Sequence, residues 1–397
     1  MEARGYIYIM SVTAVAIIGC KKHYSPPAVT ADHNYLVVEG VISGGGDSTI
    51  IKLSRTIQLS GADKVRHEIG AKVTVGDDQG AAFPLTETDS GRYIAPALAL
   101  NASHKYKISI VTTDGKTYES GYVPMQVGPP IDSLGYDITA NGINIYVNAH
   151  DVTNQTKYYR WDYTETYIYE SEMEDLYEFD NSYKAVSNKF RLRTPAEQVH
   201  ICYDNMDAST ILLASTSDLR QSVVNKTPIT QVASTDERIA QKYSILVKQY
   251  SLTTDAFNFW SQVKKNTEQI GTIFDVQPSE IQGNVHCTSN PGEPVIGYVS
   301  ASTVSQKRIF IDRTQIPAWP ISPPSDQCPI EKPQLVWYDA NIPVDITSGV
   351  WIPDDSLHVA YDSHNYDSVY TVKTILYNCV DCRYHNHGST VKPTFWK

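Results

Sequence analysis

The sequence lacks most of the features that identify an enzyme or a nucleic-acid-binding protein. Basic residues are outnumbered, with 33 Lys and Arg against 44 Asp and Glu, and the net charge of -11 argues against nucleic acid or an anionic membrane surface as a partner. There is no phosphate-binding loop and no Gly-x-Ser-x-Gly elbow, and His67-Glu68 lacks the second histidine of a zinc-protease helix. We therefore expect no enzymatic activity and no cofactor.

Long hydrophobic runs are also missing, apart from one near the N-terminus. The apolar stretch 6–18 follows Arg4, and its length of about 13 residues is too short to span a bilayer as a helix, which takes roughly 20. It ends in Ile18-Gly19-Cys20, which is the pattern of a bacterial lipoprotein signal. The sequence predicts a signal peptide at 1–19, lipidation of Cys20 and a polar tether at 20–33, and the alternative is an ordinary end to a signal region.

Phenylalanine is scarce, with 8 copies, whereas tyrosine has 27, and tyrosine favours both strands and contact surfaces. Tyr163, Tyr167 and Tyr169 alternate along one face of a predicted strand, and Tyr177 lies in the acidic stretch 170–183 that follows. We predict that these four tyrosines contact a ligand or partner. The alternative for 170–183 is a solvated loop.

The chain divides into two parts at a proline-rich boundary, 124–130. Residues 34–125 alternate like strands separated by turns, with no convincing helix, and predict an immunoglobulin-like or transthyretin-like β-sandwich. Residues 131–397 predict a larger β-rich region similar to fibronectin type III, with a helix near 254–270 capped by Thr253 or Thr254 and a cysteine-containing C-terminus. Two strands at 295–303 and 307–312 are expected to form a hairpin.

Several stretches resemble one known family. They are VVEGVIS at 37–43, KYSILVKQYSLTTDAFNFW at 242–260, GEPVIGYVSASTVSQKRIFI at 292–311 and CVDCRYHNHGSTVKPTFW at 379–396. Together with the lipoprotein signal, they resemble the Bacteroidota lipoprotein family known as domain of unknown function 4249. The resemblance implies a non-enzymatic protein of the outer membrane, on its periplasmic or cell-surface face, with a TonB-dependent, SusC-like transporter as neighbour. The family's terminal pattern is C-x-x-C, a glycine-containing stretch, and Pro393, Phe395 and Trp396.

Cysteine is scarce as well. After Cys20 the thiols are Cys202, Cys287, Cys328, Cys379 and Cys382. An exported protein lies in an oxidising compartment, which favours disulfides, and an odd number leaves at least one thiol without an intrachain partner. We predict that Cys379 and Cys382 form disulfides with Cys287, with Cys328 or with each other.

A metal site is the alternative at the same place. Cys379, Cys382, His385 and His387 lie within nine positions and are ligand types that zinc accepts. The two histidines do not belong to the family's terminal pattern, so such a site would be peculiar to this chain. A redox pair is a further alternative, although no thioredoxin-like strand and helix surround it.

These observations favour a non-enzymatic outer-membrane lipoprotein that acts as an accessory or ligand-binding subunit of a TonB-dependent transporter. Two other classes stay open. One is a secreted hydrolase of glycan or peptide that uses paired carboxylates, and the other is a purely structural envelope protein.

Overall fold

The computed structural model describes residues 34–321, apart from 58–64, 90, 173, 175–176, 180–189, 269–280 and 282, and also 334–338, 350–353, 368–375, 379, 381–385 and 388–397. The predicted signal peptide, Cys20 and the predicted tether therefore lie outside the described residues. The described chain is mainly strand, with one long helix, α2 (Thr254–Glu268). This confirms the expected fold class and the expected helix. No helix within the described ranges combines the length and the apolar character needed to cross a membrane.

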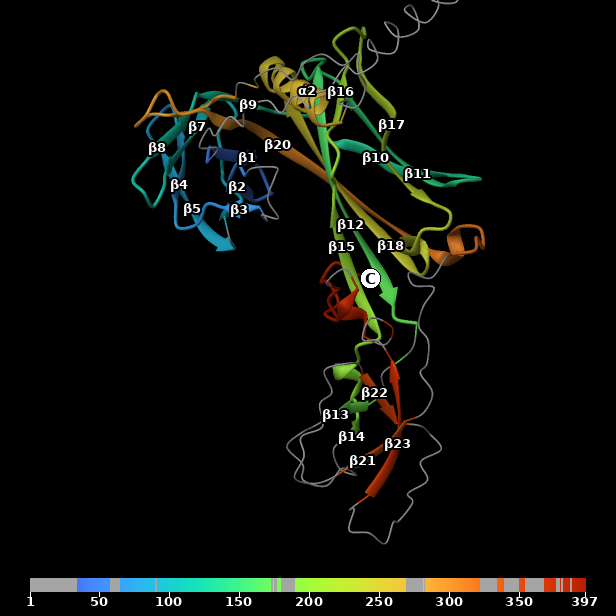
Figure 1. The fold of residues 1–397 in the computed structure, drawn as a ribbon. Helices are drawn as coiled ribbons and strands as arrows, with labels where there is room; N and C mark the ends of the chain where they lie inside the picture. The colour runs from blue at the N-terminus through green and yellow to red at the C-terminus, as the bar shows by residue number, and fades with distance from the viewer. Residues whose placement is uncertain are drawn as a thin grey trace, which may run out of the picture.

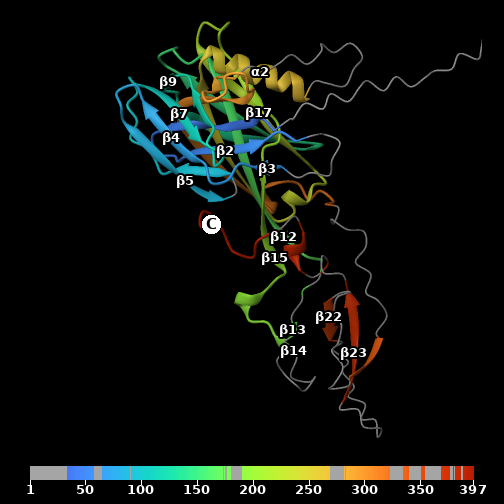
Figure 2. The same ribbon diagram turned by 60° about the vertical axis from the view of Figure 1, so that its left-hand side comes forward.

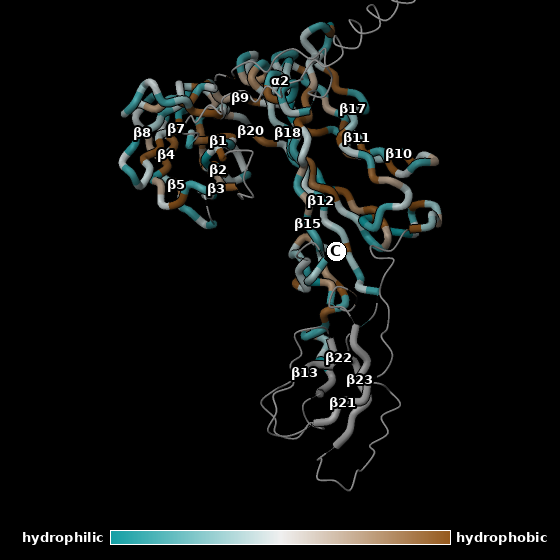
Figure 3. Tube along the Cα trace, viewed as in Figure 1, coloured by the Kyte–Doolittle hydropathy of each residue, from teal (hydrophilic) through white to brown (hydrophobic). Residues whose placement is uncertain are grey.

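The first part of the chain forms an N-terminal sandwich in which buried and more exposed residues alternate along strands such as β4 and β7. Figure 3 shows hydrophobic and hydrophilic residues interspersed along its strands. Its strands are β1 (Leu36–Gly44), β2 (Thr49–Arg55), β3 (Arg66–His67), β4 (Lys72–Asp77), β5 (Ala82–Asp89), β6 (Arg92–Ala95), β7 (Lys105–Val111), β8 (Thr117–Ser120) and β9 (Val123–Gln126). Ile51, Tyr93, Ile108 and Tyr118 are among its fully buried core residues. The alternation of apolar and polar residues in the sequence thus predicts correctly which side of these strands faces the core.

One strand belongs to two sandwiches. β20 (Val295–Asp312) pairs through its first half, in parallel, with β1, and through its second half, antiparallel, with β18 (Lys242–Leu252). The expected hairpin at 295–312 is therefore wrong. The segment 303–306, which is polar apart from Val304, lies where β20 leaves one sandwich for the other, and the chain does not turn there. β20 also brings Val299 and Ala301 into the N-terminal core. Figure 1 shows β20 running continuously between the two sandwiches.

The N-terminal sandwich consequently extends beyond 34–125. The short strand β19 (Val285–Cys287) pairs with β8, and β9 pairs with both β7 and β20. The strands of this sandwich and one sheet of the second sandwich belong to a single 15-stranded sheet, because β20 continues through both.

The second sandwich packs two sheets face to face. One sheet is three-stranded, in the order β10 (Ile131–Thr139), β11 (Gly142–Asp151), β17 (Ser222–Ala233). The other contains β12 (Tyr158–Glu170), β15 (Ile201–Asp207), β16 (Leu212–Ser215), β18 and the second half of β20. Trp161 is fully buried between them, and its Nε1 donates to Gln249 Oε1 at 2.9 Å, so the polar atom of this large side chain is satisfied.

The remaining elements are short. They are the strands β13 (Tyr177–Phe179), β14 (Phe190–Leu192), β21 (Gln334–Tyr338), β22 (Val350–Pro353) and β23 (Ser368–Ile375), and the 3₁₀ turns η2 (Pro195–Glu197), η3 (Glu237–Ile239), η4 (Arg313–Gln315) and η5 (Cys382–Tyr384). The C-terminal segment that begins at η5 lies beside β12 and β15 in both views (Figures 1 and 2).

Candidate functional site

A cleft lined by charged, polar and apolar side chains lies where the two sandwiches meet. One wall is the outer face of β1, β2 and β6, the other is the outer face of β12 and β18, and the end of α2 and the loop 207–211 complete the lining. Its volume is about 770 Å³, and a smaller hollow of about 190 Å³ continues from it along β1 to β18 and β20. The cleft is therefore a consequence of β20, which joins the sandwiches at this junction.

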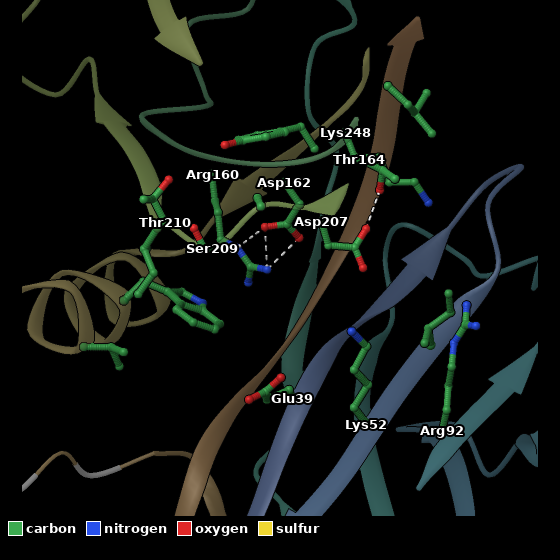
Figure 4. Close-up of a pocket in the computed structure, with 17 residues that line it drawn as sticks. Glu39, Lys52, Arg92, Arg160, Asp162, Thr164, Asp207, Ser209, Thr210 and Lys248 are labelled. Atoms are coloured by element: carbon green, nitrogen blue, oxygen red, sulfur yellow. Dashed lines mark hydrogen bonds and ion pairs between the residues drawn. The ribbon is translucent and has the colours of Figure 1, made fainter. Parts of the chain in front are cut away.

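The wall formed by β12 carries an ion pair held by aromatic rings. Strand alternation turns Arg160 and Asp162 away from the core residue Trp161 that lies between them. Arg160 Nη2 contacts Asp162 Oδ2 at 2.7 Å and Oδ1 at 3.0 Å (Figure 4). The guanidinium lies 4.1 Å from the ring centre of Trp260 and 5.4 Å from that of Tyr250. Arg160 is thus fixed in place by charge and by cation–π contact.

The floor of the junction contains an ion pair between the sandwiches. Asp47 lies in the turn after β1, and its Oδ2 is 2.6 Å from Lys248 Nζ on β18. Both side chains are partly buried, at 20% and 25% exposure, so water screens this pair less than a surface pair. The contact ties the turn of one sandwich to a strand of the other.

The opposite wall presents a row of three charged residues. Glu39 lies across from Lys52 on β1 and β2, and Lys52 lies across from Arg92 on β2 and β6. All three side chains are exposed and line the cleft, and Figure 4 shows Lys52 and Arg92 side by side. Within the described part of the chain, none of the three side chains has a hydrogen-bond or ion-pair partner. Two cations of the described chain therefore face the cleft without an acidic side chain paired to them.

The end of α2 fixes the loop that closes the cleft. Thr253 Oγ1 accepts a hydrogen bond from the Ala256 amide at 3.2 Å and so caps the helix, as expected from the sequence. At the other end, Lys264 Nζ donates to Ile211 O at 2.7 Å, and Glu268 accepts from the Ile211 amide at 2.6 Å. The loop that carries Asp207 is thereby held against the helix.

The lining of the cleft carries several charged and hydrogen-bonding side chains. Glu39 and Asp207 are exposed, Asp207 accepts from Thr164 Oγ1 at 2.8 Å, and Asp162 is engaged by Arg160. The lining residues include no histidine or cysteine to act as a base or nucleophile. In the described ranges no group of three His, Cys, Asp or Glu side chains is arranged to hold a metal ion. What the cleft offers is a fixed set of hydrogen-bonding and charged groups.

The structure places the four predicted contact tyrosines in different environments. Tyr163 is half-buried and lines the cleft. For Tyr167 and Tyr169 the prediction is wrong, because they are 1% and 7% exposed and belong to the core of the second sandwich. The aromatic face of β12 is the face that the β10–β11–β17 sheet covers. Tyr177 lies in β13, and its side chain is outside the described part of the structure.

The sequence did not single out Lys52, Arg92, Arg160 or Trp260. Alternation along each strand signals that Lys52 and Arg160 point away from their cores. The sequence carries no signal that these two outer faces meet. The strand that brings them together, β20, is predicted from the sequence to be a hairpin instead.

The cysteine predictions are partly confirmed. Cys382 is bonded to Cys202, with a sequence separation of 180 residues, and Cys379 is also disulfide-bonded. The candidate Cys287 is wrong, because it is a free thiol buried in the N-terminal sandwich. Cys202 was not a candidate, and Cys328 lies outside the described residues. The buried position of Cys202 near the start of β15 could not be inferred from cysteine spacing.

The C-terminal segment docks on β15 around this disulfide. The Tyr203 amide donates to Ser389 O at 2.8 Å, and the Ser389 amide donates back to Tyr203 O at 3.2 Å. A Cβ at Gly388 would lie 2.1 Å from Asp204 Oδ1, so only glycine fits this close approach. Trp396 packs edge-on against Tyr203, with ring centres 5.3 Å apart. The glycine and tryptophan of the terminal pattern thus have packing roles.

The proposed metal ligands are not available as a set. Cys379 and Cys382 are both in disulfides, and His387 lies outside the described residues. The ring of His385 is instead held between two carboxylates, with Nδ1 3.1 Å from Asp204 Oδ2 and Nε2 3.2 Å from Glu237 Oε1. The zinc alternative at these four positions is therefore wrong.

His385 is protonated at neutral pH in this setting. Burial lowers the pKa of the ring, but the hydrogen bonds to Asp204 and Glu237 and their charges outweigh burial and raise the pKa to about 9. The ring also stacks on Tyr169, with centres 3.8 Å apart. The imidazolium thus pins the C-terminal segment to the second sandwich, while the cleft lies on the opposite face of β12.

Comparison with known proteins gives a family but no activity. No curated protein matches the chain. A solved segment of two fibronectin type-III domains from chicken tenascin is 12% identical, with 54% of this chain and 89% of that chain covered and a TM-score of 0.15. The sequence model described as "Domain of unknown function (DUF4249)" matches residues 21–308. The chain belongs to this family of unknown function.

Proposed function

We propose that this protein is a non-enzymatic outer-membrane lipoprotein, anchored through Cys20, that serves as an accessory or ligand-binding subunit of a TonB-dependent transporter. The charged cleft between the two sandwiches is the ligand site in this proposal. Its volume lies in the range of small-molecule sites, and its lining contains polar groups already held in place by ion pairs. This cleft is the observation on which the proposal depends most.

Three further features support the proposal. The lipoprotein signal ending at Cys20 favours attachment by lipid rather than by a membrane-spanning segment. The carboxylates of the cleft are exposed or engaged by Arg160, whereas the acid of a glycoside hydrolase lies in a pocket that shields it from water. The family resemblance implies a transporter as neighbour.

Purification from the native outer membrane tests the partner. A tagged full-length chain, extracted with mild detergent from outer membranes of its own host, should bring down a TonB-dependent transporter in near-equal amount. The reason is that an accessory subunit must remain bound to the channel it serves. Quantitative mass spectrometry of the eluate is the measurement, and an unrelated lipoprotein with the same tag is the control.

Two further outcomes test the lipid anchor and the transporter partner separately. Cys20→Ala should give an unacylated chain that leaves the membrane fraction, and continued membrane attachment of that variant would refute the lipid anchor. Absence of any transporter from the wild-type eluate would count against the accessory role even if acylation is found.

A further inference from the structure

Two of the four cations in the cleft already have anionic partners. Arg160 is engaged by Asp162, and Lys248 is engaged by Asp47 at 2.6 Å. Lys52 and Arg92 have no such partner in the described part of the chain, and Asp89, which lies across from Arg92 on β5, forms no ion pair with it. Glu39 lies across from Lys52 without forming an ion pair with it, so the two unpaired cations of the cleft lie next to each other.

The position of these two residues is unfavourable for the protein alone. Lys52 and Arg92 occupy directly opposite positions on neighbouring strands, where like charges repel each other. An anionic group placed between their side chains would remove this repulsion. A planar guanidinium next to an ammonium suits a carboxylate or a sulfate, since Arg binds two oxygens at once and Lys adds a point charge.

The surrounding backbone argues against an extended peptide as the occupant. β1, β2, β6, β12 and β18, which form the two walls, are each paired on both edges. An added strand therefore finds no free edge on these five strands, and recognition along the two walls must come from side chains. Those side chains include Glu39, Asp207, Ser209 and Thr210, which hydrogen-bond well to hydroxyl groups.

We propose that the cleft binds a small hydroxyl-rich organic acid of the acidic-sugar class, with its carboxylate or sulfate between Lys52 and Arg92. The hydroxyl groups of the ligand lie toward Glu39 and Asp207, which are the exposed carboxylates of the cleft. This inference rests on the ligand-binding part of the proposed function and adds the class of ligand.

Calorimetric titration of the full chain tests it. The probes are digalacturonic acid, a sulfated disaccharide and the uncharged disaccharide of galactose. We expect at least one acidic probe to bind ten-fold or more tightly than the neutral one, and its affinity to fall as salt is added. The double variant Lys52→Met with Arg92→Met should lose at least ten-fold in affinity for that probe.

A charge-matched control distinguishes the site from the general field of the protein. Lys72→Met with Lys105→Met removes two exposed cations from β4 and β7 of the same sandwich and should leave the affinity unchanged. Lys52 and Arg92 are exposed and unpartnered, so we expect both double variants to unfold at the temperature of the wild type.

Each remaining outcome contradicts the inference. Equal binding of the neutral disaccharide would refute the anion pair while leaving a ligand site in place. Tighter binding of an acidic dipeptide would overturn the sugar class. No binding of any probe would overturn the inference, whereas the proposed transporter association is decided separately by co-purification.

Discussion

At the scale of single residues, the positive charge of His385 helps to hold the C-terminal segment against the second sandwich. Its imidazolium lies between Asp204 and Glu237, and its side chain is only 16% exposed. The pKa of about 9 in the folded protein stands above the ordinary value of 6.5. Protonation therefore stabilises the fold: the contribution is complete below pH 6.5 and is lost as the pH rises through 9.

The first prediction concerns this pH window. Replacing His385 with Gln should lower the free energy of unfolding by on the order of 2 kcal/mol near pH 6.5, and by much less at pH 9.5. Urea unfolding of wild type and variant across this range is the measurement. His150→Gln is the control, because His150 pairs with Asp132 at the surface, where such a pair contributes little. An equal loss at both pH values would show that His385 acts by packing alone.

At the scale of elements, β20 depends on a glycine where it crosses β1. Gly297 has φ of +139°, and a Cβ there would lie 2.0 Å from the backbone oxygen of Val38. Any side chain would push the two strands apart, because the nearest atom belongs to the backbone and cannot swing away. The parallel pairing that joins the sandwiches therefore requires glycine at this position.

The second prediction is that Gly297→Ala destabilises the protein strongly. Strain at this φ and separation of the strands should together cost about 2 kcal/mol or more, seen as a lower midpoint in thermal or urea unfolding. Gly292→Ala, in the turn before β20, is the control, since the nearest atom to its added Cβ is 3.8 Å away. If the two variants unfold alike, the close approach of β1 and β20 is not important for stability.

The sequence predicted elements better than their partners. Alternation identified the strands of the N-terminal sandwich, and the Thr253 cap marked the start of α2. Prediction from the sequence failed where contacts between residues far apart in the chain determine the structure. β1 meets β20 across more than half of the chain, and Cys202 meets Cys382 across 180 residues. For the same reason the sequence predicts a contact surface on the face that carries Tyr167, although a second sheet covers that face. The cleft between the sandwiches also depends on long-range contacts and could not be predicted.

At the scale of the whole molecule, the two sandwiches depend on each other. β19 and the first half of β20 complete the N-terminal core with Val285, Cys287, Val299 and Ala301. Without them, β1 would present an open edge and an uncovered apolar face, which favours aggregation. The proline-rich segment 124–130 separates the two predicted parts in the sequence. In the fold, however, strands from beyond it return to complete the N-terminal sandwich.

The third prediction follows for a fragment of residues 34–128. It should fail to unfold cooperatively and should aggregate, whereas residues 34–397 should unfold cooperatively. Circular dichroism during heating and the dispersion of amide signals in NMR are the measurements. A fragment that unfolds sharply at the temperature of the longer chain would contradict the shared core.

The disulfide also has a consequence for the order of events during synthesis. Because 180 residues separate Cys202 from Cys382, roughly 10 to 40 s of translation pass before the second thiol exists. Cys287 is made first and is the nearer competitor. In the folded chain it is only 3% exposed, where β19 pairs with β8. Early docking of β19 would hide the wrong partner before the right one arrives, so timing as well as geometry favours the native bond.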